Sequence, residues 1–587
     1  MPQVQLRVLH NGDDVFLIWR SAKPISGCRG FAVYRERNGA VEIAQSWAGF
    51  KNEKWEKGEH RPSTVWPIQK YMWSDYAPKM GDSVRYRIVP VVRKNGKLQE
   101  AADMASEWSD KLKVDPQVSK RFACYFNRGI VATQWVQRLL GPEEKVQARR
   151  AKLDDVITDY DNPHARNLLG GQLRDKMMSL LEEAKDKKQK VWAALFELTD
   201  KELWTALGDI GANAIVVLAD GAVAKSTKSD DNDAGADPGV KSTGRKDDEN
   251  YEARQALKNA GVKVYNRMTK GKFLAHNKIL VIGDNKDPRW VWTGSTNWTP
   301  SGLCTQANNG ILIDDPALAA KYRDQIELLA KDKGLSPPAL AESNSTPVNE
   351  NVGQTPVTVW FTRTNKLVDL QDAIARIKAA KNGALFLMFQ TGMKNSLLGA
   401  IMDRRTDDDF YVHGVISTMP QVSGQKKGSK KSKQKPTHDD TIAKQVAFVH
   451  RNERIKYAPD LLVPFAVEGE TEHWFDEFVK KNGAHAIVHS KIVVLDPFGD
   501  KPIVITGSHN MGTTASSKND ENLVIVEGDG NLAAAYAVNV MGIYNNYRWR
   551  YRLAEGSKWD GLDDGDSWQK SYFNDPAKVA EAKFWES

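Results

Sequence analysis

The chain has 587 residues, of which 41% are hydrophobic and 27% are charged, and its net charge is +8. This length is too great for one hydrophobic core, so we expect three or four globular domains. No apolar stretch is long enough to cross a bilayer, and residues 1–7 lack the apolar segment of a secretory signal, which argues against an integral membrane protein and predicts a cytoplasmic location.

Cysteine content and charge narrow the chemistry further. The three cysteines are too far apart to predict a disulfide framework or a metal-ligand cluster; they are Cys28, Cys124 and Cys304. They fit a reducing compartment, and no other set of residues has the spacing of metal ligands. The positive charge favours encounter with anions such as phospholipid headgroups or nucleic acid, but it does not choose between them.

The N-terminal residues 1–115 read as short β-strands separated by turn residues. Runs rich in β-branched and aromatic residues predict strands at 15–19, 30–35 and 83–91. Together they predict an all-β sandwich. A Trp in an early strand and a Tyr-x-Ile strand late in the domain resemble the fibronectin type III pattern. Such a module more often binds a partner or acts as a spacer than catalyses.

From about residue 116 the pattern becomes α/β, and it does so twice. Strand-like segments at 124–128 and 359–363 open the two halves. Each half continues with a helical segment and then a buried strand, at 191–196 and 384–389. Continuous apolar strands with helices between them predict a sheet that is covered on both faces.

The predicted domains are therefore a β-sandwich over residues 1–115, a first α/β domain over 116–340 and a second α/β domain over 341–587. A segment rich in Pro, Ser and Asn, 335–354, is interpreted as the linker between the two halves. The C-terminal tail contains several tryptophans, which we expect to tie the tail onto the domain rather than to form a membrane-inserting patch; they are Trp549, Trp559, Trp568 and Trp585.

Each α/β half also contains a polar insertion. Residues 225–250 contain several aspartates among Gly, Ser and Lys, and residues 423–437 contain six lysines. Neither insertion can bury enough apolar surface to fold alone, so both are expected to be mobile loops. The lysine run could grip a polyanion, or it could be a solvated loop with no specific role.

The most informative feature is a motif that is present twice. In each copy a His is followed two residues later by a Lys, then by an apolar segment, an acidic residue and a Gly-Ser-x-Asn turn. The offset between the copies is 213 residues both for His (489 − 276) and for Ser (508 − 295), which predicts a duplicated structural unit and one site built from two half-sites. The motif residues are His276, Lys278, Asp284, Ser295 and Asn297 in the first copy, and His489, Lys491, Asp496, Ser508 and Asn510 in the second.

These residue types suit the cleavage of a phosphodiester without a metal ion. The reaction needs a nucleophile, a proton donor for the leaving oxygen and fixed positive charge around the phosphoryl oxygens. One His can attack and the other can donate a proton, while Lys278 and Lys491 neutralise the developing charge. Strand alternation would put each His and its Lys on one face, and the Ser and Asn of each turn could hydrogen-bond phosphoryl oxygens.

The doubled motif, over roughly residues 119–551, resembles that of the phospholipase D superfamily. The resemblance implies a covalent phosphohistidine intermediate, no cofactor, no required metal, and an active site at the pseudo-two-fold interface between the halves. It also implies that His276 is the nucleophile and that His489 is the acid that later activates water. His509, the variable residue of the second turn, is expected to support the site or to lie at the surface.

The spacing of the acidic residue differs between the copies. Four residues separate Lys491 from Asp496, which is the usual count in the family, whereas five separate Lys278 from Asp284. A small bulge or a shifted turn would absorb the extra residue, and Asp287 competes with Asp284 for the position. In the family this Asp is mostly structural, so the difference does not put activity in doubt.

A second difference concerns the residues downstream of each turn. The 213-residue offset aligns Asn308 with Glu521. In relatives an acidic residue near this position accepts a hydrogen bond from Nδ1 of a catalytic His, which leaves Nε2 free to react. A nucleophilic His gains most from a carboxylate partner, because the phosphohistidine is positively charged. If the partners cross between the halves, Glu521 orients His276 and Asn308 orients His489.

The expected function is that of a phospholipase D-type phosphodiesterase, which hydrolyses the phosphodiester of a phospholipid headgroup. We expect a monomer, because both half-sites lie in one chain, with peripheral membrane contact possible. A nuclease that uses the same histidines on DNA or RNA is the main alternative: many nucleases of the family carry one motif and dimerise, but the lysine-rich insertion and the missing signal favour it. An inactive scaffold protein and an effector exported without a signal are further alternatives, although intact motifs argue against the scaffold.

Overall fold

The structure is a computed structural model, and it describes most of the chain. The insertions at 225–247 and 423–437 and the side chains of Trp549 and Trp559 lie outside the described part. For residues 146–150, 338, 447–450, 461–462 and 549–554 only the backbone is described. The described residues are 4–56, 58–130, 132, 146–222, 248–269, 273–284, 287–332, 338–389, 392–404, 407, 409–417, 447–450, 461–462, 488–554 and 561–587.

The N-terminal part of the chain forms two β-sheets and a short two-stranded ribbon. One sheet has the order β1-β2-β7, the other has the order β10-β8-β3-β4 with β9 also paired to β8, and β5 pairs with β6. The strands predicted at 15–19, 30–35 and 83–91 are confirmed as β2, β3 and β8. The strands are β1 (Val4–His10), β2 (Val15–Ser21), β3 (Cys28–Arg37), β4 (Ala40–Ile43), β5 (Gln45–Ser46), β6 (Arg61–Pro62), β7 (Met72–Asp75), β8 (Ser83–Lys94), β9 (Lys97–Glu100) and β10 (Leu112–Lys113), with a 3-10 turn at Ala102–Met104.

A seven-stranded mixed sheet follows, with the order β11-β17-β16-β15-β12-β13-β14. The predicted strands at 124–128 and 191–196 correspond to β11 and β12. Its elements are β11 (Phe122–Phe126), α2 (Val146–Ile157), α3 (His164–Asp186), β12 (Lys190–Leu195), α4 (Lys201–Gly208), a 3-10 turn (Gly211–Asn213), β13 (Ala214–Ala219), α5 (Tyr251–Asn259), β14 (Lys263–Arg267), β15 (Lys278–Asp284), β16 (Asp287–Gly294), α6 (Pro300–Cys304), β17 (Asn309–Asp314) and α7 (Pro316–Lys331).

A second mixed sheet contains nine described strands, in the order β18-β19-β26-β25-β24-β20-β21-β22-β23. The predicted strands at 359–363 and 384–389 correspond to the end of β19 and to β20. Its elements are α8 (Pro338–Ser343), β18 (Val348–Val352), β19 (Thr355–Phe361), α9 (Val368–Ala379), β20 (Gly383–Met388), α10 (Leu397–Asp403), β21 (Tyr411–Ile416), β22 (Ala447–His450), β23 (Leu461–Leu462), β24 (Ile492–Leu495), β25 (Ile503–Gly507), α12 (Thr513–Lys518), β26 (Asn522–Glu527) and α13 (Gly530–Ala554).

The interpretation of 335–354 as a linker is wrong in part. Helix α8 occupies Pro338–Ser343, and β18 pairs antiparallel with β19 along the edge of the second sheet. The Asn-rich composition misled the prediction, because β18 is an edge strand whose side chains are mostly exposed or half-buried, so polar residues are tolerated there.

Six strands of each sheet pair in the same pattern. In the first sheet β12 is parallel to β13. The remaining neighbours in this part of the sheet, β11-β17, β17-β16, β16-β15 and β15-β12, are all antiparallel. In the second sheet β20 is parallel to β21, and the pairs from β19 to β20 are antiparallel. Both sheets therefore carry the His-containing segment just before a central strand, β15 in the first and β24 in the second.

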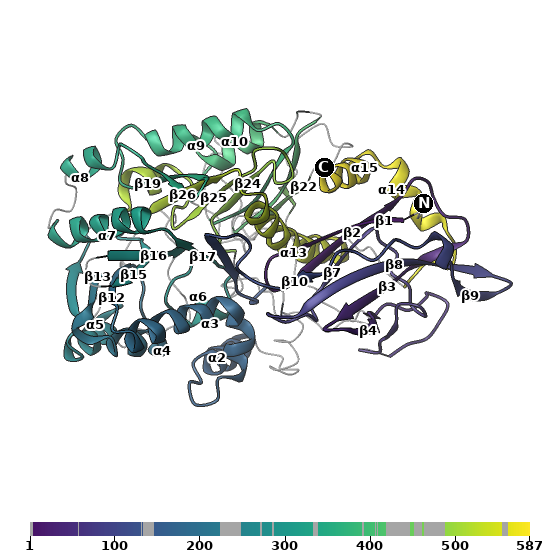
Figure 1. Ribbon diagram of the computed structural model, residues 1–587, viewed down its shortest axis with the longest axis horizontal. Helices are drawn as coiled ribbons and strands as arrows, with labels where there is room; N and C mark the ends of the chain where they lie inside the picture. Colours follow the sequence, from purple (N-terminus) through teal and green to yellow (C-terminus); the bar gives the residue numbers. More distant parts are fainter. Residues whose placement is uncertain are drawn as a thin grey trace, which may run out of the picture.

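The two mixed sheets face each other across a layer that contains α7 and α13 (Figure 1). Ile279, Val281, Leu385 and Val494 from the facing sides of the sheets belong to one continuous apolar core with these helices. The outer face of the first sheet packs against α3, α4 and α5, and that of the second packs against α9 and α10. Each sheet is thus covered on both faces, as the apolar strands predicted.

The C-terminal tail returns to the N-terminal sheets (Figure 1). It comprises a 3-10 turn (Ser567–Gln569), α14 (Lys570–Asn574) and α15 (Pro576–Glu586). Trp585 is fully buried, with its ring centroid 5.0 Å from that of Phe16. The Gln569 side chain accepts a hydrogen bond from the backbone NH of Ile25 (2.9 Å), and Trp568 packs against Phe31. The prediction that tryptophans tie the tail down is confirmed for Trp568 and Trp585.

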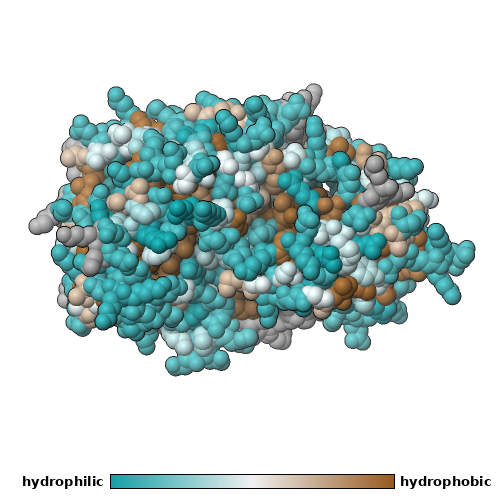
Figure 2. All heavy atoms as spheres, in the orientation of Figure 1, coloured by the Kyte–Doolittle hydropathy of each residue, from teal (hydrophilic) through white to brown (hydrophobic). Residues whose placement is uncertain are grey.

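None of the described helices combines the length and apolar character that a membrane span requires. The face of the molecule shown in Figure 2 is mostly hydrophilic, with small, scattered apolar patches.

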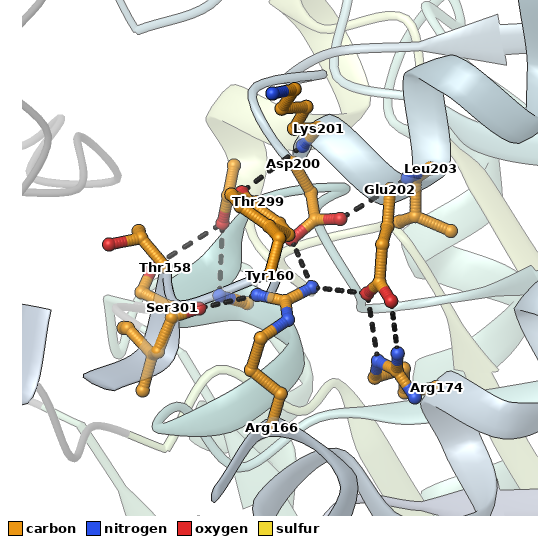
Figure 3. Close-up of polar contacts among 12 residues, drawn as sticks. Thr158, Tyr160, Arg166, Arg174, Asp200, Lys201, Glu202, Leu203, Thr299 and Ser301 are labelled. Atoms are coloured by element: carbon orange, nitrogen blue, oxygen red, sulfur yellow. Dashed lines mark hydrogen bonds and ion pairs between the residues drawn. The ribbon is translucent and has the colours of Figure 1, made fainter. Parts of the chain in front are cut away.

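A buried ion cluster joins α3 to the start of α4 (Figure 3): Arg166 lies between Asp200 and Glu202, at 2.8 and 2.7 Å, and Arg174 also contacts Glu202. Asp200 caps α4, so the cluster fixes the chain that leaves β12.

Candidate active site

Both histidine segments lie in the interior, where the two mixed sheets meet. Only 3% of His276 and 1% of His489 is exposed, and Lys278 and Lys491 are equally buried. Strand β15 begins at Lys278 and β24 begins one residue after Lys491. The histidines therefore precede the strands, which corrects the expectation that strand alternation sets their direction.

The backbone of each histidine segment pairs with a loop from the other sheet. The NH of His489 donates to the carbonyl of Ala307 (3.0 Å), and the NH of Asp520 donates to the carbonyl of Leu274 (2.8 Å). The Ser490 hydroxyl also donates to Ala307 O, at 2.9 Å. These crossed contacts bring the residues downstream of one turn beside the histidine of the other copy.

Two further hydrogen bonds join the sheets symmetrically. The Thr293 hydroxyl donates to Oδ1 of Asn522, and Nδ2 of Asn309 donates to the Thr506 hydroxyl, both at 2.8 Å. All four side chains are almost completely buried. Since a buried polar side chain without a partner is costly, these paired bonds fix the position of one sheet against the other.

His276 is paired with a carboxylate from the second sheet. Its Nδ1 lies 2.8 Å from Oε1 of Glu521. Glu521 is itself held by Nδ2 of Asn519 (2.9 Å) and the backbone NH of Asn510 (3.0 Å). Burial raises the pKa of Glu521, but His276, His509 and Asn519 outweigh burial and bring it down to about 2. An ionised Glu521 accepts the Nδ1 proton of His276, which leaves Nε2 with a free lone pair.

His489 is paired with an amide from the first sheet. Its Nδ1 lies 2.9 Å from Oδ1 of Asn308. Asn308 donates through Nδ2 to the carbonyl of Gly302 (2.8 Å), and its Oδ1 also accepts from the Ser295 hydroxyl (2.7 Å). The orientation of this amide makes Nδ1 of His489 the donor, so Nε2 carries the lone pair in the neutral ring. The two pairs are those that the sequence argument expected.

Both imidazoles have lowered pKa values. Burial, followed by the charge of Lys278, lowers the pKa of His276 to about 4 despite the opposing effect of Glu521. Burial and the nearby Lys491, Lys278 and His276 lower the pKa of His489 well below its usual value. His276 thus lies close enough to lower the pKa of His489. With both pKa values lowered, both rings are neutral near pH 7.

Each histidine and its lysine pack against one phenylalanine. The rings of His276 and Phe196 have centroids 4.8 Å apart, and Nζ of Lys278 lies 5.0 Å from the Phe196 centroid. The same distances in the second sheet are 4.8 Å for His489 and 4.8 Å for Lys491, both to Phe389. The sequence analysis missed these rings. Each ring is the last residue of a predicted buried strand, and in the structure each directly follows the observed strand, β12 or β20.

The two lysines are held by backbone carbonyls. Nζ of Lys278 donates to the carbonyl of His276 (2.8 Å), and Nζ of Lys491 donates to that of His489 (2.6 Å). Burial lowers the pKa of Lys278 to about 7, although Glu197 and Glu521 oppose it, and burial lowers the pKa of Lys491 well below its usual value. Buried cations with no ion pair at hydrogen-bonding distance among the described residues are suited to bind an anion.

The serines of the two turns are engaged inside the protein. The Ser295 hydroxyl accepts from the NH of Asn309 (3.0 Å) besides donating to Asn308, and the Ser508 hydroxyl accepts from the NH of Asn522 (3.1 Å). This differs from the expectation that the serines face phosphoryl oxygens. Their role in the fold is to latch each turn onto the following strand.

Each turn lies so close to the backbone of the strand that follows it that the turn needs a glycine there. Gly294 and Gly507 have φ angles of 151° and 128°, and a Cβ at either position would collide with the backbone of Asn309 or Asn522. The asparagines of the two turns make fewer hydrogen bonds inside the protein than the serines do. Oδ1 of Asn297 and Oδ1 of Asn510 have no hydrogen-bond partner among the described residues, so they are better placed than the serines to meet a ligand.

The acidic residues of the two motifs lie away from the histidines and stabilise the fold. Asp496 accepts hydrogen bonds from the backbone NH groups of Lys381, Asn382 and Gly383, at 2.6 to 2.9 Å. Asp284 accepts one from Nε2 of Gln189, at 2.9 Å. The register of β15 against β16 shifts between Ile282 and Gly283, so a strand irregularity does absorb the extra residue.

His509 is buried rather than at the surface. Its Nε2 lies 3.0 Å from Oδ2 of Asp369, and its Nδ1 accepts from the NH of Met511 (2.8 Å). Burial lowers its pKa, but Asp369 and Glu521 outweigh burial and raise it. His509 therefore supports the loop that carries Glu521.

Within the described ranges, no cluster of three or more His, Cys, Asp or Glu side chains is arranged to hold a metal ion.

Comparison with known proteins gives one family match. Residues 177–329 and 465–541 match the family model described as "Cardiolipin synthase, PLD-like domain". No curated protein matches the chain. The matched ranges contain both histidine motifs.

Several solved structures resemble the chain at low identity. Nuc, a phospholipase D family member from Salmonella typhimurium, is 18% identical, with a TM-score of 0.19, over 26% of this chain and 84% of that one. Phosphatidylserine synthase from Haemophilus influenzae is 11% identical, with a TM-score of 0.38, over 71% and 91%. Polyphosphate kinase from Porphyromonas gingivalis is 10% identical, with a TM-score of 0.39, over 95% and 82%.

Proposed function

We propose that the chain is a phosphodiesterase that hydrolyses a phospholipid headgroup phosphodiester through a phosphohistidine intermediate. The observation that carries the proposal is the pair of crossed contacts, His276 with Glu521 and His489 with Asn308, beside two buried lysines. We further propose that residues 116–340 and 341–587 are two related halves that share this site, and that residues 1–115 are a fibronectin type III-like module.

In the proposed reaction, Nε2 of His276 attacks phosphorus and the bond from phosphorus to the leaving oxygen breaks. Glu521 stabilises the positive charge that develops on His276, and the lysines stabilise the charge on the phosphoryl oxygens. His489 protonates the leaving oxygen, then removes a proton from the water that hydrolyses the phosphohistidine. Because His489 is neutral in the empty site, it must gain its proton with the anionic substrate, which raises its pKa.

A purely structural role fits the site poorly. Lys278 and Lys491 are buried with lowered pKa values, and their ammonium groups contact carbonyl oxygens rather than carboxylates. Among the described residues neither lysine has an ion pair at hydrogen-bonding distance, and burial of a charge in that state costs stability, so a scaffold protein would gain little from keeping both lysines. A phosphoryl anion would supply the missing partner.

The lipid substrate is favoured by the description of the matched family model, which names cardiolipin synthase. A nucleic acid substrate is the second candidate, because the sequence contains a lysine-rich segment at 423–437 that could bind a polyanion. The same two histidines would act on either substrate, since the reacting group is a phosphodiester in both.

The test compares both substrates directly. Purified protein is incubated in EDTA with phosphatidylglycerol and cardiolipin vesicles and, separately, with single-stranded and double-stranded DNA, and His276→Ala and His489→Ala are the controls. We expect release of headgroup and phosphatidate by the unmutated protein alone. Cleavage of DNA instead would establish the nuclease. If both variants keep the activity of the unmutated protein, the proposed site is wrong.

A further inference from the structure

Asn127 is a buried residue behind the site that the proposed mechanism does not use. It directly follows β11, and only 8% of it is exposed. Its Oδ1 accepts a hydrogen bond from the backbone NH of Asn308 (2.9 Å), and its Nδ2 donates to the carbonyls of Leu303 (2.9 Å) and Gln306 (2.5 Å). Nδ2 also lies 3.3 Å from the carbonyl of Gly302. One side chain thus fastens the loop that ends in Asn308 to the end of β11.

The carboxamide of Asn308, which pairs with His489, depends on the same loop. Nδ2 of Asn308 donates to the carbonyl of Gly302 (2.8 Å), and this carbonyl is the one that Nδ2 of Asn127 also reaches. Asn127 therefore fixes the backbone of Asn308 and also the acceptor that orients its amide. Without these contacts, Oδ1 of Asn308 would be directed less firmly at Nδ1 of His489.

Thr362 occupies the corresponding place in the second sheet. It directly follows β19, as Asn127 follows β11, and it is fully buried. Its hydroxyl accepts from the backbone NH of Glu521 (3.0 Å) and donates to the carbonyl of Asn519 (2.8 Å), and its own NH donates to the carbonyl of Glu521 (2.9 Å). Nδ2 of Asn519 in turn donates to Oε1 of Glu521 (2.9 Å). Thr362 therefore fixes the backbone of Glu521 and also the residue that orients its carboxylate.

The two arrangements are equivalent in position, although their side chains differ. β11 pairs antiparallel with β17, and β19 pairs antiparallel with β26; in both sheets the contacts reach the residue just before the partner strand. The carbonyls of Gln306 and Asn519, which accept from the two side chains, lie 213 residues apart (519 − 306), the offset of the doubled motif. The same contact thus recurs where each sheet presents the partner of the opposite histidine.

We propose that Asn127 and Thr362 are positioning residues for the reaction proposed above, on which this inference rests: each holds the partner of the histidine from the opposite sheet. Asn127 acts through Asn308, and Thr362 acts through Glu521. The two residues therefore serve different histidines and different steps. Thr362 supports the attack on phosphorus, and Asn127 supports the activation of water.

The kinetic test uses matched variants. Thr362→Val keeps the shape of the side chain and removes the hydroxyl, Thr362→Ser keeps the hydroxyl, and Asn127→Ala removes the amide. Thr358→Val is the control, because Thr358 is also buried on β19 and its hydroxyl donates to Asn349 at the edge of the sheet (2.9 Å). The substrate is bis(p-nitrophenyl) phosphate, whose leaving group departs without a proton. In rapid mixing, the burst reports formation of the phosphoenzyme and the steady state reports its hydrolysis.

We expect Thr362→Val to slow the burst about tenfold and Thr362→Ser to stay within about threefold of the unmutated protein, because only the first variant lacks the hydroxyl. Asn127→Ala should keep the burst within about threefold and slow the steady state about tenfold. Thr358→Val should change neither rate. Addition of Asn127→Ala to Asn308→Ala should slow hydrolysis no further than Asn308→Ala alone, because both residues act through one contact.

A second measurement needs no turnover. The ring nitrogens of the 11 histidines are labelled with a heavy isotope for NMR, and their shifts report the tautomer and the hydrogen bond of each imidazole. His276→Ala and His489→Ala assign the two rings. We expect Thr362→Val to shift the ring signals of His276 and not those of His489, and Asn127→Ala to do the reverse.

Equal slowing of both steps by Thr362→Val or by Asn127→Ala would overturn the inference, because a general packing defect produces it. A Thr362→Ser variant as slow as Thr362→Val, or unchanged ring signals in both sheets, would overturn it too. An unmutated protein that cleaves no diester contradicts the proposed function, whereas the ring signals still test the inference. If Asn127→Ala does not fold, Asn127→Ser keeps a small polar side chain without the amide, and it should slow the same step.

Discussion

Nδ1 of His276 lies 2.8 Å from Oε1 of Glu521, so a carboxylate of the second mixed sheet sets the tautomer of a histidine of the first. The equivalent partner of His489 is the amide of Asn308. A carboxylate stabilises a cationic imidazole better than an amide does, and the proposed phosphohistidine would be cationic at the ring. The two half-sites therefore differ in chemistry although their backbones pair alike.

This difference predicts distinct effects for Glu521→Gln and Asn308→Ala. Glu521→Gln should slow formation of the phosphoenzyme by about 10²-fold or more, because His276 loses its counter-charge. Asn308→Ala should slow its hydrolysis instead, since His489 loses its orientation. Rapid-mixing kinetics with bis(p-nitrophenyl) phosphate separates the burst from the steady state. A full-rate burst from Glu521→Gln would show that Glu521 does not support the nucleophile.

His489→Ala should trap the intermediate. The p-nitrophenolate group leaves without a proton donor, so the first step survives in this variant, whereas water is no longer activated in the second. We expect one equivalent of nitrophenolate per protein and, by mass spectrometry, a stable protein adduct that carries the remaining nitrophenyl phosphoryl group on a histidine and is lost in acid. His276→Ala should give neither. Trapping in His276→Ala but not in His489→Ala would reverse the two roles.

The sequence predicted the strands that follow the two histidines from their apolar pattern. The crossed partners were expected from the constant offset together with the resemblance to the phospholipase D superfamily, which implies an acidic residue beside a histidine. The sequence did not predict Phe196 or Phe389, since an aromatic residue after a buried strand is ordinary core until its contact with a histidine is known. Ser295 and Ser508 misled for the opposite reason: a Ser in a turn can face a ligand or the backbone, and only the packing of the turn decides.

Stability should fall as the pH is lowered from 6.5 to 4. The pKa of His276 is about 4 in the folded protein against about 6.5 in the unfolded chain, so the unfolded chain binds more protons between these values and folding weakens as pH falls. The loss from this residue is at most about 3 kcal/mol, because each pKa unit corresponds to about 1.4 kcal/mol. Glu521, with a pKa of about 2, adds a further loss below about pH 4.3.

Thermal unfolding between pH 7 and pH 4.5 measures this effect. His276→Gln, which cannot take up a proton, should show a smaller decrease in Tm over this range than the unmutated protein. Parallel Tm curves for the two proteins would mean that the protonation of His276 is not linked to unfolding.

Lys278→Met should abolish activity and yet stabilise the fold at pH 7. Burial lowers the pKa of Lys278 to about 7, which means that folding opposes its charge, and Met fills a similar volume without that cost. We expect a rise in Tm of a few degrees, with phosphodiesterase activity reduced about 10²-fold or more. Lys185→Met, at an exposed ion pair with Asp209, should change neither quantity. A lower Tm for Lys278→Met would show that the ammonium group contributes to folding.

Asp496 and Asp287 should differ in their effect on stability and agree in their effect on catalysis. Asp496→Ala leaves three backbone NH groups before β20 without their acceptor, which should lower the free energy of unfolding by about 2–4 kcal/mol. Asp287→Ala changes an exposed residue at the start of β16 and should have no measurable effect. Urea unfolding gives the stabilities, and kcat for the activated diester is measured below the transition. Because neither carboxylate contacts a histidine, kcat should stay within about threefold of the unmutated protein, whereas a loss of 10²-fold in Asp496→Ala would place this acid in the reaction itself.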